Sequence, residues 1–193
     1  MKPLFIGISG PSACGKSATV KELLKLNSSF VRFKVDNYWK DAHTFPTKHG
    51  YRNWERPENL NFDLVYKHLL LLKQGKPLID APIYKKGKRY TKIFEPKNII
   101  FVEGFLLFAD ERINKLLDLK IYIDVPGEIS IQRKIAGNRK ESSSEEYCRK
   151  VYWPEYKQYV KPFKEKAELI LDGTSKIQTN VNIILNKIKE LNS

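Results

Sequence analysis

The chain has 193 residues, with 35 Lys and Arg against 22 Asp and Glu, and it is 41% hydrophobic and 12% aromatic. This composition supplies a core and excludes wholesale disorder, and the length favours one domain over residues 1–193. The formal net charge of +13 attracts phosphates, so nucleotides, nucleic acid and acidic lipid are all candidate partners. The opening residues are too short an apolar run for a signal or a membrane span, and Cys14 and Cys148 form no C-x-x-C pair, so we expect a cytoplasmic protein.

Short apolar runs alternate with amphipathic segments along the whole chain. The predicted strands are Leu4–Ser9, Phe30–Val35, Asn98–Glu103, Lys120–Val125 and Glu168–Asp172. The predicted helices are Lys16–Leu26, Leu60–Lys73, Asp110–Leu117, a long charged stretch Glu128–Lys166, and Lys176–Leu191. The strands are continuously apolar, which is typical of a sheet covered on both faces. The predicted fold class is therefore α/β: a three-layer sandwich with a five-stranded, mainly parallel sheet.

One stretch differs in composition from the rest. From Arg133 to Lys166 apolar residues thin out while Arg, Lys, Glu and Ser accumulate. We expect this stretch to contribute little to the core and to form a projecting, mobile helical segment.

The strongest motif is the octet G-P-S-A-C-G-K-S, which follows the first strand and precedes the first helix. Glycines let backbone N–H groups converge on one anion at the helix N-terminus, Lys16 reaches the β- and γ-phosphates, and Ser17 can ligate Mg²⁺. The motif predicts a P-loop NTPase-type fold that binds a nucleotide with Mg²⁺, but alone it does not separate GTPases, ATPase motors and small-molecule kinases. No N-K-x-D motif for reading guanine occurs. The predicted nucleotide-binding residues of the loop are Gly10, Ser12, Ala13, Cys14, Gly15, Lys16 and Ser17.

Two acids close predicted strands at the edge where the phosphate loop lies. Asp36 follows the second strand and Glu103 ends the third, and in open α/β sheets the chemistry lies beyond the carboxyl ends of the strands. We expect Glu103 to hold Mg²⁺ with Ser17, and Asp36 to accept the proton of an attacking hydroxyl. A turn cap for Asp36 and a purely structural acid for Glu103 are the alternatives. Asp124, before Val-Pro-Gly, is better read as a turn residue.

Phosphoryl transfer also needs cations that close over the nucleotide. Arg133 and Arg139 lie in the basic stretch I-Q-R-K-I-A-G-N-R. We expect a helical lid near residues 133–150, with Arg133 in catalysis and acceptor binding and Arg139 on the nucleotide. A solvated helix charge is the alternative for each.

The chain resembles the phosphate-loop nucleoside kinases, which include uridine-cytidine kinase and nicotinamide riboside kinase, over nearly its whole length. The motifs that carry the resemblance are GPSACGKS, VDNYW, NWERPENL, FVEGFLLF, RKIAGNR, VYWPEY and AELILDG. The resemblance implies transfer of the ATP γ-phosphate to the 5′-hydroxyl of a riboside. It places Asp36 at the base and Glu103 at the acid associated with Mg²⁺.

The two branches of this family predict different acceptors. NWERPENL, EGFLLF, WPEY and LDGT look more like nicotinamide riboside kinase, where an acid after the aromatic residue contacts the ribose; here that acid is Glu55, where Asp is more usual. Tyr38 and Trp54 would then face the cationic nicotinamide ring, unless both belong to the core. Tyr84 instead matches the uridine kinase branch, although Arg89 stands where that branch has a His. Nicotinamide riboside kinase is the first expectation and uridine-cytidine kinase the alternative.

Two other classes fit the sequence less well. A nucleic-acid-binding module would explain the charge, but no RNP, KH or helix-turn-helix pattern occurs, so we expect no specific nucleic acid and no membrane partner. A kinase for another acceptor, such as pantothenate or a phosphorylated sugar, would share the loop and sheet. The cluster of Tyr38, Trp39 and Trp54 favours a flat ring in the acceptor. The oligomeric state stays open.

Overall fold

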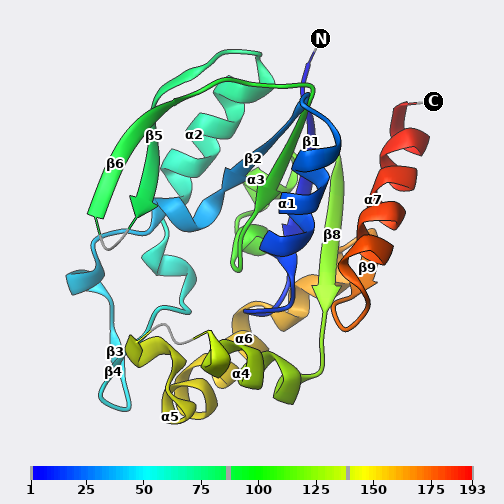
Figure 1. Ribbon diagram of the computed structural model, residues 1–193. Coiled ribbons are helices and arrows are strands. Elements are labelled where there is room, and N and C mark those ends of the chain that lie inside the picture. The colour runs from blue at the N-terminus through cyan, green and yellow to red at the C-terminus, as the bar shows by residue number, and fades with distance from the viewer. Residues whose placement is uncertain (1, 86–87, 138–139, 193) are drawn as a thin grey trace.

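A computed structural model describes residues 2–85, 88–137 and 140–192. Its central sheet has five parallel strands in the order β2-β7-β1-β8-β9, as predicted (Figure 1). The strands are β1 (Leu4–Ser9), β2 (Phe30–Lys34), β7 (Ile99–Glu103), β8 (Leu119–Asp124) and β9 (Leu169–Asp172).

The register of the three central strands brings the chemistry-bearing residues to one edge. Glu103 at the end of β7 is level with Ile8 of β1 on one side and Lys34 of β2 on the other. The phosphate loop begins two residues after Ile8, and Asp36 follows two residues after Lys34. Parallel strands therefore deliver the loop and both acids to the same end of the sheet.

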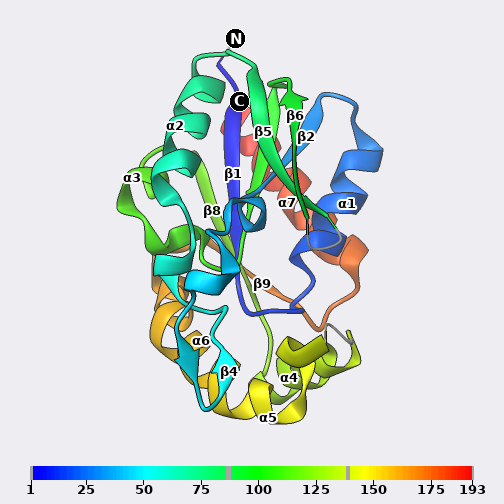
Figure 2. The ribbon, with the colours of Figure 1, turned by 90° about the vertical axis from the view of Figure 1, so that its left-hand side faces the viewer.

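Helices cover both faces of the sheet, which is why its strands are apolar on both sides. Helices α1 (Lys16–Leu26) and α7 (Ile177–Asn192) pack on one face through Val20, Leu23, Val181, Ile184 and Ile188. Helices α2 (Phe62–Lys73) and α3 (Glu111–Asn114) lie on the other face (Figure 2). The result is the three-layer sandwich that the sequence predicts.

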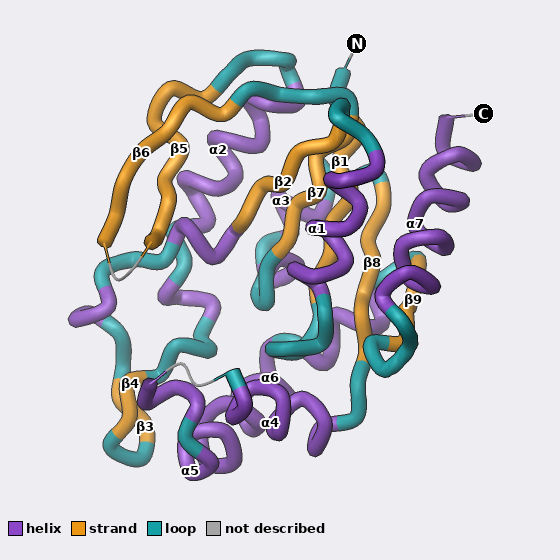
Figure 3. Tube along the Cα trace, in the orientation of Figure 1, coloured by secondary structure: helices purple, strands orange, loops and turns teal. Residues whose placement is uncertain are grey.

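The predicted helix Glu128–Lys166 is in fact several short elements beyond the carboxyl ends of the strands (Figure 3). These are α4 (Gly127–Ala136), α5 (Glu145–Tyr147), a π-helical turn Cys148–Tyr152, α6 (Trp153–Tyr159) and 3₁₀ turns at Lys140–Ser143 and Lys161–Lys166. Pro154 and Pro162 each stand near the start of an element, where the missing N–H costs no helical hydrogen bond.

The expectation that residues 133–166 contribute little to the core is wrong. Seven side chains of this stretch are at most 7% exposed and belong to the core on the α2 side of the sheet: Tyr147, Cys148, Val151, Tyr152, Tyr156, Val160 and Phe163. They are one, three or four residues apart in succession, a pattern that puts them on one side of a helical path. The average composition of the segment does not reveal this row of buried side chains, because the opposite side of the path carries many charged residues.

Two hairpins complete the fold, and the sequence analysis assigns neither. The short pair β3 (Thr47–Lys48) and β4 (Tyr51–Arg52) lies near α5, and the longer pair β5 (Leu78–Lys85) and β6 (Lys88–Phe94) stands beside α2 (Figure 1). Among the described residues of β6, only Phe94 is buried. Because β6 is so exposed, its sequence contains no apolar run from which a strand could be predicted.

Candidate active site

The loop between β1 and α1 curls because three of its residues have positive φ. The φ angles of Gly10, Ala13 and Gly15 are 140°, 58° and 108°. A Cβ at Gly10 would lie 2.2 Å from the carbonyl oxygen of Ile123, so only glycine fits there. The curl leaves a cavity of about 220 Å³ at the N-terminus of α1. Its lining is Ser12, Ala13, Cys14, Gly15, Lys16, Ser17, Ala18, Asp36 and Phe105.

Contacts from two directions hold this loop in shape. The Lys16 ammonium donates to the carbonyl oxygens of Gly10 and Pro11, each at 2.8 Å. The N–H of Ser12 donates to the Tyr152 hydroxyl at 2.9 Å, and Ser130 of α4 donates to the Ser12 carbonyl at 2.8 Å. The loop is therefore packed against Ser130 and Tyr152, which flank the segment 133–150 that is expected to form a lid.

The two predicted metal ligands lie together. Ser17 donates its hydroxyl hydrogen to Oε1 of Glu103 at 3.1 Å, and the Glu103 side chain is 3% exposed. The second carboxylate oxygen, Oε2, is buried and has no hydrogen-bond partner among the residues that the structure describes. A buried, unpaired carboxylate oxygen beside a hydroxyl fits Mg²⁺, which usually takes one or two protein oxygens and completes its shell with phosphates and water.

Asp36 lies in the 3₁₀ turn Val35–Tyr38, which directly follows β2, and it lines the phosphate-loop cavity. Its Oδ1 is buried and is likewise unpaired within the described part of the chain. A buried carboxylate oxygen without a protein donor, on a residue that lines a cavity, can accept a proton or a metal ion. The structure thus brings Lys16, Ser17, Asp36 and Glu103 to one place.

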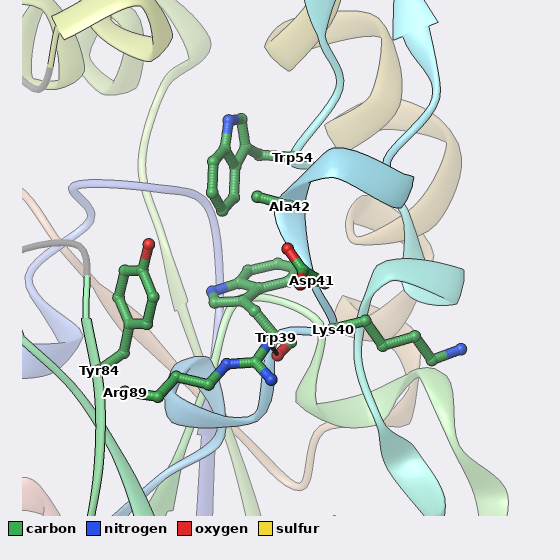
Figure 4. Close-up of a pocket in the computed structure, with 7 residues that line it drawn as sticks. All are labelled: Trp39, Lys40, Asp41, Ala42, Trp54, Tyr84 and Arg89. Atoms are coloured by element: carbon green, nitrogen blue, oxygen red, sulfur yellow. Dashed lines mark hydrogen bonds between the residues drawn. The ribbon is translucent and has the colours of Figure 1, made fainter.

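A second cavity, of about 310 Å³, adjoins the far end of the same turn. Figure 4 shows Trp39 and Trp54 with Tyr84 and Arg89 facing them from the β5–β6 hairpin, while the Lys40 side chain extends away. Trp39 and Trp54 meet edge to face, with ring centroids 6.1 Å apart. Asp41 and Ala42 complete the lining. The cavity offers flat apolar walls and a cation, which suits a planar ring with polar edges.

The hairpin is tied to the turn that carries Asp36. The N–H of Tyr84 donates to Oδ1 of Asn37 at 3.2 Å, and the Arg89 guanidinium donates to the carbonyl oxygen of Trp39. These bonds fix the aromatic cavity relative to Asp36.

Tyr38 does not line the aromatic cavity, contrary to the role given to it above. Its side chain is 4% exposed, stacks on Phe33 and makes a 2.8 Å hydrogen bond with Nδ1 of His68. Burial, followed by the charge of Asp80, raises the pKa of Tyr38, so its hydroxyl stays protonated. In a short 3₁₀ turn, Asp36 and Tyr38 point to different sides, and Tyr38 takes the core side.

Glu55, which the sequence analysis expects to contact the ribose, is buried and already bonded to other side chains. Its side chain is 6% exposed, and its Oε1 accepts from Tyr147 at 3.0 Å and from Lys134 of α4 at 3.3 Å. Burial and the nearby Glu55 charge raise the pKa of Tyr147, which keeps that hydroxyl a donor. Glu55 therefore joins the segment carrying Trp54 to α4.

Of the two lid arginines, Arg133 is described and Arg139 lies outside the described residues. Arg133 of α4 donates to the carbonyl oxygen of Gly173 at 2.9 Å. Gly173 itself packs against the phosphate loop, since a Cβ there would lie 2.5 Å from the carbonyl oxygen of Cys14. Arg133 is thus near the loop but bonded to the turn after β9.

Sequence reasoning did not single out Arg32 or Lys134, and it named Trp39 only within an aromatic cluster. Arg32 of β2 forms an ion pair with Glu103 across the sheet. A single charged residue in a strand, such as Arg32, belongs to no sequence motif from which its role could be predicted. Only the pairing of β2 with β7 reveals its partner.

No helix in the described part of the chain is long and apolar enough to cross a membrane. Nor do the described residues gather three or more His, Cys, Asp or Glu side chains into a metal-binding cluster. The magnesium site inferred here needs no such cluster.

The sequence matches the profile of the Phosphoribulokinase / Uridine kinase family over residues 5–180. It is 34% identical to a uridine kinase of Borreliella burgdorferi (strain ZS7) over 177 residues, covering 86% of this chain and 85% of that protein. It is 32% identical over 203 residues to a uridine kinase of Clostridium perfringens (strain ATCC 13124), covering 98% and 97%.

Two solved structures share the fold. A possible uridine kinase from Bacillus stearothermophilus superposes with a TM-score of 0.67 at 18% identity, covering 89% of this chain and 90% of that one. Shikimate kinase from Acinetobacter baumannii superposes with a TM-score of 0.55 at 15% identity, covering 97% and 94%. At these identities the likeness concerns architecture alone.

Proposed function

The chain belongs to the Phosphoribulokinase / Uridine kinase family and is an ATP-dependent nucleoside kinase, and we propose that it phosphorylates the 5′-hydroxyl of uridine or cytidine. One observation carries the proposal. A single 3₁₀ turn joins the two cavities, with Asp36 lining the phosphate-loop cavity and Trp39, at its end, lining the aromatic one.

The aromatic cavity favours a pyrimidine over nicotinamide. The pyridinium ring of nicotinamide riboside is cationic, and Arg89 would repel it across a small cavity. Uracil and cytosine are neutral and carry carbonyl oxygens that can accept from Arg89 or from the hydroxyl of Tyr84. The relatives described above are named uridine kinases, so the comparisons also support the alternative rather than the first expectation.

Each side chain then has a role in the transfer. Lys16 leaves the carbonyl oxygens of its own loop to contact the β- and γ-phosphates. Asp36 orients the 5′-hydroxyl and accepts its proton as the oxygen attacks the γ-phosphorus, while the bond from that phosphorus to the β,γ-bridging oxygen breaks and ADP leaves. Arg133 and Arg139 are proposed to stabilise charge on the transferring group from the lid.

Ser17 and Glu103 would hold Mg²⁺, which when bound neutralises charge on the β- and γ-phosphates. Asp36 lines the phosphate-loop cavity together with Ser17, so it could orient water around the ion as well as the acceptor hydroxyl. Trp39, Trp54 and Tyr84 enclose the base and exclude water from it.

The proposal is tested by ADP formation with ATP and a panel of acceptors: uridine, cytidine, nicotinamide riboside and 5′-deoxyuridine. We expect uridine or cytidine to exceed nicotinamide riboside at least ~10-fold in kcat/KM, as one unfavourable charge contact predicts. The compound 5′-deoxyuridine should inhibit without turnover. A preference for nicotinamide riboside would overturn the pyrimidine assignment, and turnover with no riboside would overturn the proposed acceptor class.

A further inference from the structure

Arg32 lies on β2, where a charged side chain pointing into a sheet–helix interface needs a specific partner. The register pairs Arg32 with Phe101 and Lys34 with Glu103, so Arg32 and Glu103 project to the same face of neighbouring strands. The Arg32 side chain is 19% exposed and that of Glu103 is 3% exposed. The pair is therefore largely removed from water.

Two donors, Arg32 and Ser17, meet at one carboxylate oxygen of Glu103. The Arg32 guanidinium donates to Oε1 of Glu103 and also to the Ser17 hydroxyl, at 3.3 Å for the latter. Ser17 donates its own hydrogen to that same Oε1 at 3.1 Å. On the other side of the carboxylate, Oε2 is buried with no partner in the described chain, and so is Nε of Arg32.

We propose that Arg32 is a positioning residue that acts as a built-in counter-ion of Glu103, and that a divalent cation replaces it there. This inference depends on the metal site of the proposed function. Its basis is that a buried carboxylate is costly without a cation, and Arg32 supplies one through Oε1 while Oε2 keeps no hydrogen-bond partner among the described residues. The same two residues, Ser17 and Glu103, are the proposed ligands.

Arg32 and a divalent ion cannot share these ligands without mutual repulsion. Both cations would lie within a few ångströms of each other around one carboxylate and one hydroxyl. The guanidinium must therefore move off Glu103, or the ion binds more weakly than it would without Arg32. Arg32 thereby sets the concentration of free metal at which the site fills.

The test is thermal unfolding of the nucleotide-free protein in MgCl₂, with NaCl of matched ionic strength as the reference. Wild type should respond little to Mg²⁺ alone. Arg32→Gln should unfold at a temperature lower by about 5 °C or more in NaCl, because Glu103 loses its counter-ion, and MgCl₂ should restore at least half of that loss. Its half-maximal Mg²⁺ concentration should be at least ~10-fold below that of wild type.

Two variants serve as controls. Arg32→Lys keeps the charge and should restore most of the stability and the weak response to Mg²⁺. Lys25→Gln removes a cation from the exposed pair with Glu22, whose side chains are 69% and 39% exposed, and should change neither quantity. An Arg32→Gln response to Mg²⁺ equal to that of wild type would overturn the inference.

If Arg32→Gln alone does not fold, the double variant Arg32→Gln with Glu103→Gln carries the test. It has no unpaired buried charge, so it should fold and show no specific response to Mg²⁺. A specific response that survives in the double variant would overturn the inference. None of these measurements uses an acceptor, so their outcome is separate from the acceptor panel.

Discussion

His68 links the stability of the Asp36 turn to pH. It is 2% exposed, and its Nδ1 shares a hydrogen bond with the hydroxyl of Tyr38 in that turn. Burial lowers its pKa, with Asp80 opposing and Lys67 adding to the shift. The ring is therefore neutral in the folded protein at pH values where the unfolded chain already binds a proton.

The sign of the pH effect follows from that difference. Because the folded pKa is below the unfolded value of about 6.5, stability contributed by neutral His68 is complete above that value and is lost as pH falls from it toward the folded pKa. We expect the free energy of unfolding in urea to fall more steeply between pH 7 and pH 5 for wild type than for His68→Gln. Parallel pH profiles of the two proteins would contradict this.

At the level of single residues, the sequence predicted those whose chemistry depends on a motif. The octet identified Lys16 and Ser17, and the strand ends identified Asp36 and Glu103, all of which the structure brings together. Tyr38 was assigned to the wrong side of its turn, because composition cannot say which of two neighbouring aromatic residues faces the core. Arg32 was missed because its partner is 71 residues away.

Helix α4 is tied to the acceptor side of the site by a buried ion pair. Lys134 is 10% exposed and Glu55 6%, and the Lys134 ammonium also lies over the ring of Tyr152 at 4.7 Å. Among the described residues, Lys134→Met would leave the Glu55 charge with only the Tyr147 hydroxyl as a side-chain donor. We expect a loss of about 3–5 kcal/mol in the free energy of unfolding, as for other broken buried pairs.

A double-mutant cycle with Glu55→Gln checks this expectation. The double variant should recover part of the loss, giving a coupling energy above about 1 kcal/mol. The exposed pair Lys150–Glu146, with side chains 56% and 52% exposed, is the matched control and should couple by less than about 1 kcal/mol. Equal coupling in the two pairs would contradict a structural link between α4 and Glu55.

The β5–β6 hairpin contributes the polar edge of the aromatic cavity. Arg89→Met should raise KM for uridine by about 10-fold or more, the typical effect of losing a charged hydrogen bond, and leave KM for ATP unchanged. Lys92→Met, on the same strand but outside that cavity, is the control. An unchanged KM for uridine would remove Arg89 from base recognition.

Helices and strands were predictable where a single hydrophobic pattern, that of a helix or of a buried strand, extends over the whole element. The five central strands and the helices on both faces have this property, so their existence and approximate bounds followed from the sequence, whereas the order of the strands in the sheet did not. The segment 133–166 and the two hairpins did not, because charged and exposed residues there outnumber the buried ones that set the backbone path. The β5–β6 hairpin supplies Tyr84 and Arg89 to the aromatic cavity, and Trp54 of that cavity follows β4 by two residues.

On the scale of the whole molecule, the parallel sheet explains why distant residues form one site. The strand order puts β7 between β2 and β1, so Asp36, Glu103 and the phosphate loop end side by side although they are far apart in the sequence. The segment from α4 to α6 closes this end through its contacts with Ser12 and Glu55. The sheet thus fixes the phosphate side, and the peripheral segments form the acceptor side around it.

Asp36, in the turn that links the linings of the two cavities, is the proposed base, and Asp36→Asn tests this assignment most directly. We measure kcat with ATP and uridine, and the affinity for ATP by equilibrium binding, in wild type, Asp36→Asn and the exposed control Asp63→Asn, whose native side chain is 86% exposed. Asp36→Asn should lose about 10²–10⁴-fold in kcat and keep its affinity for ATP within a few-fold, while Asp63→Asn matches wild type. A normal kcat in Asp36→Asn would contradict the account.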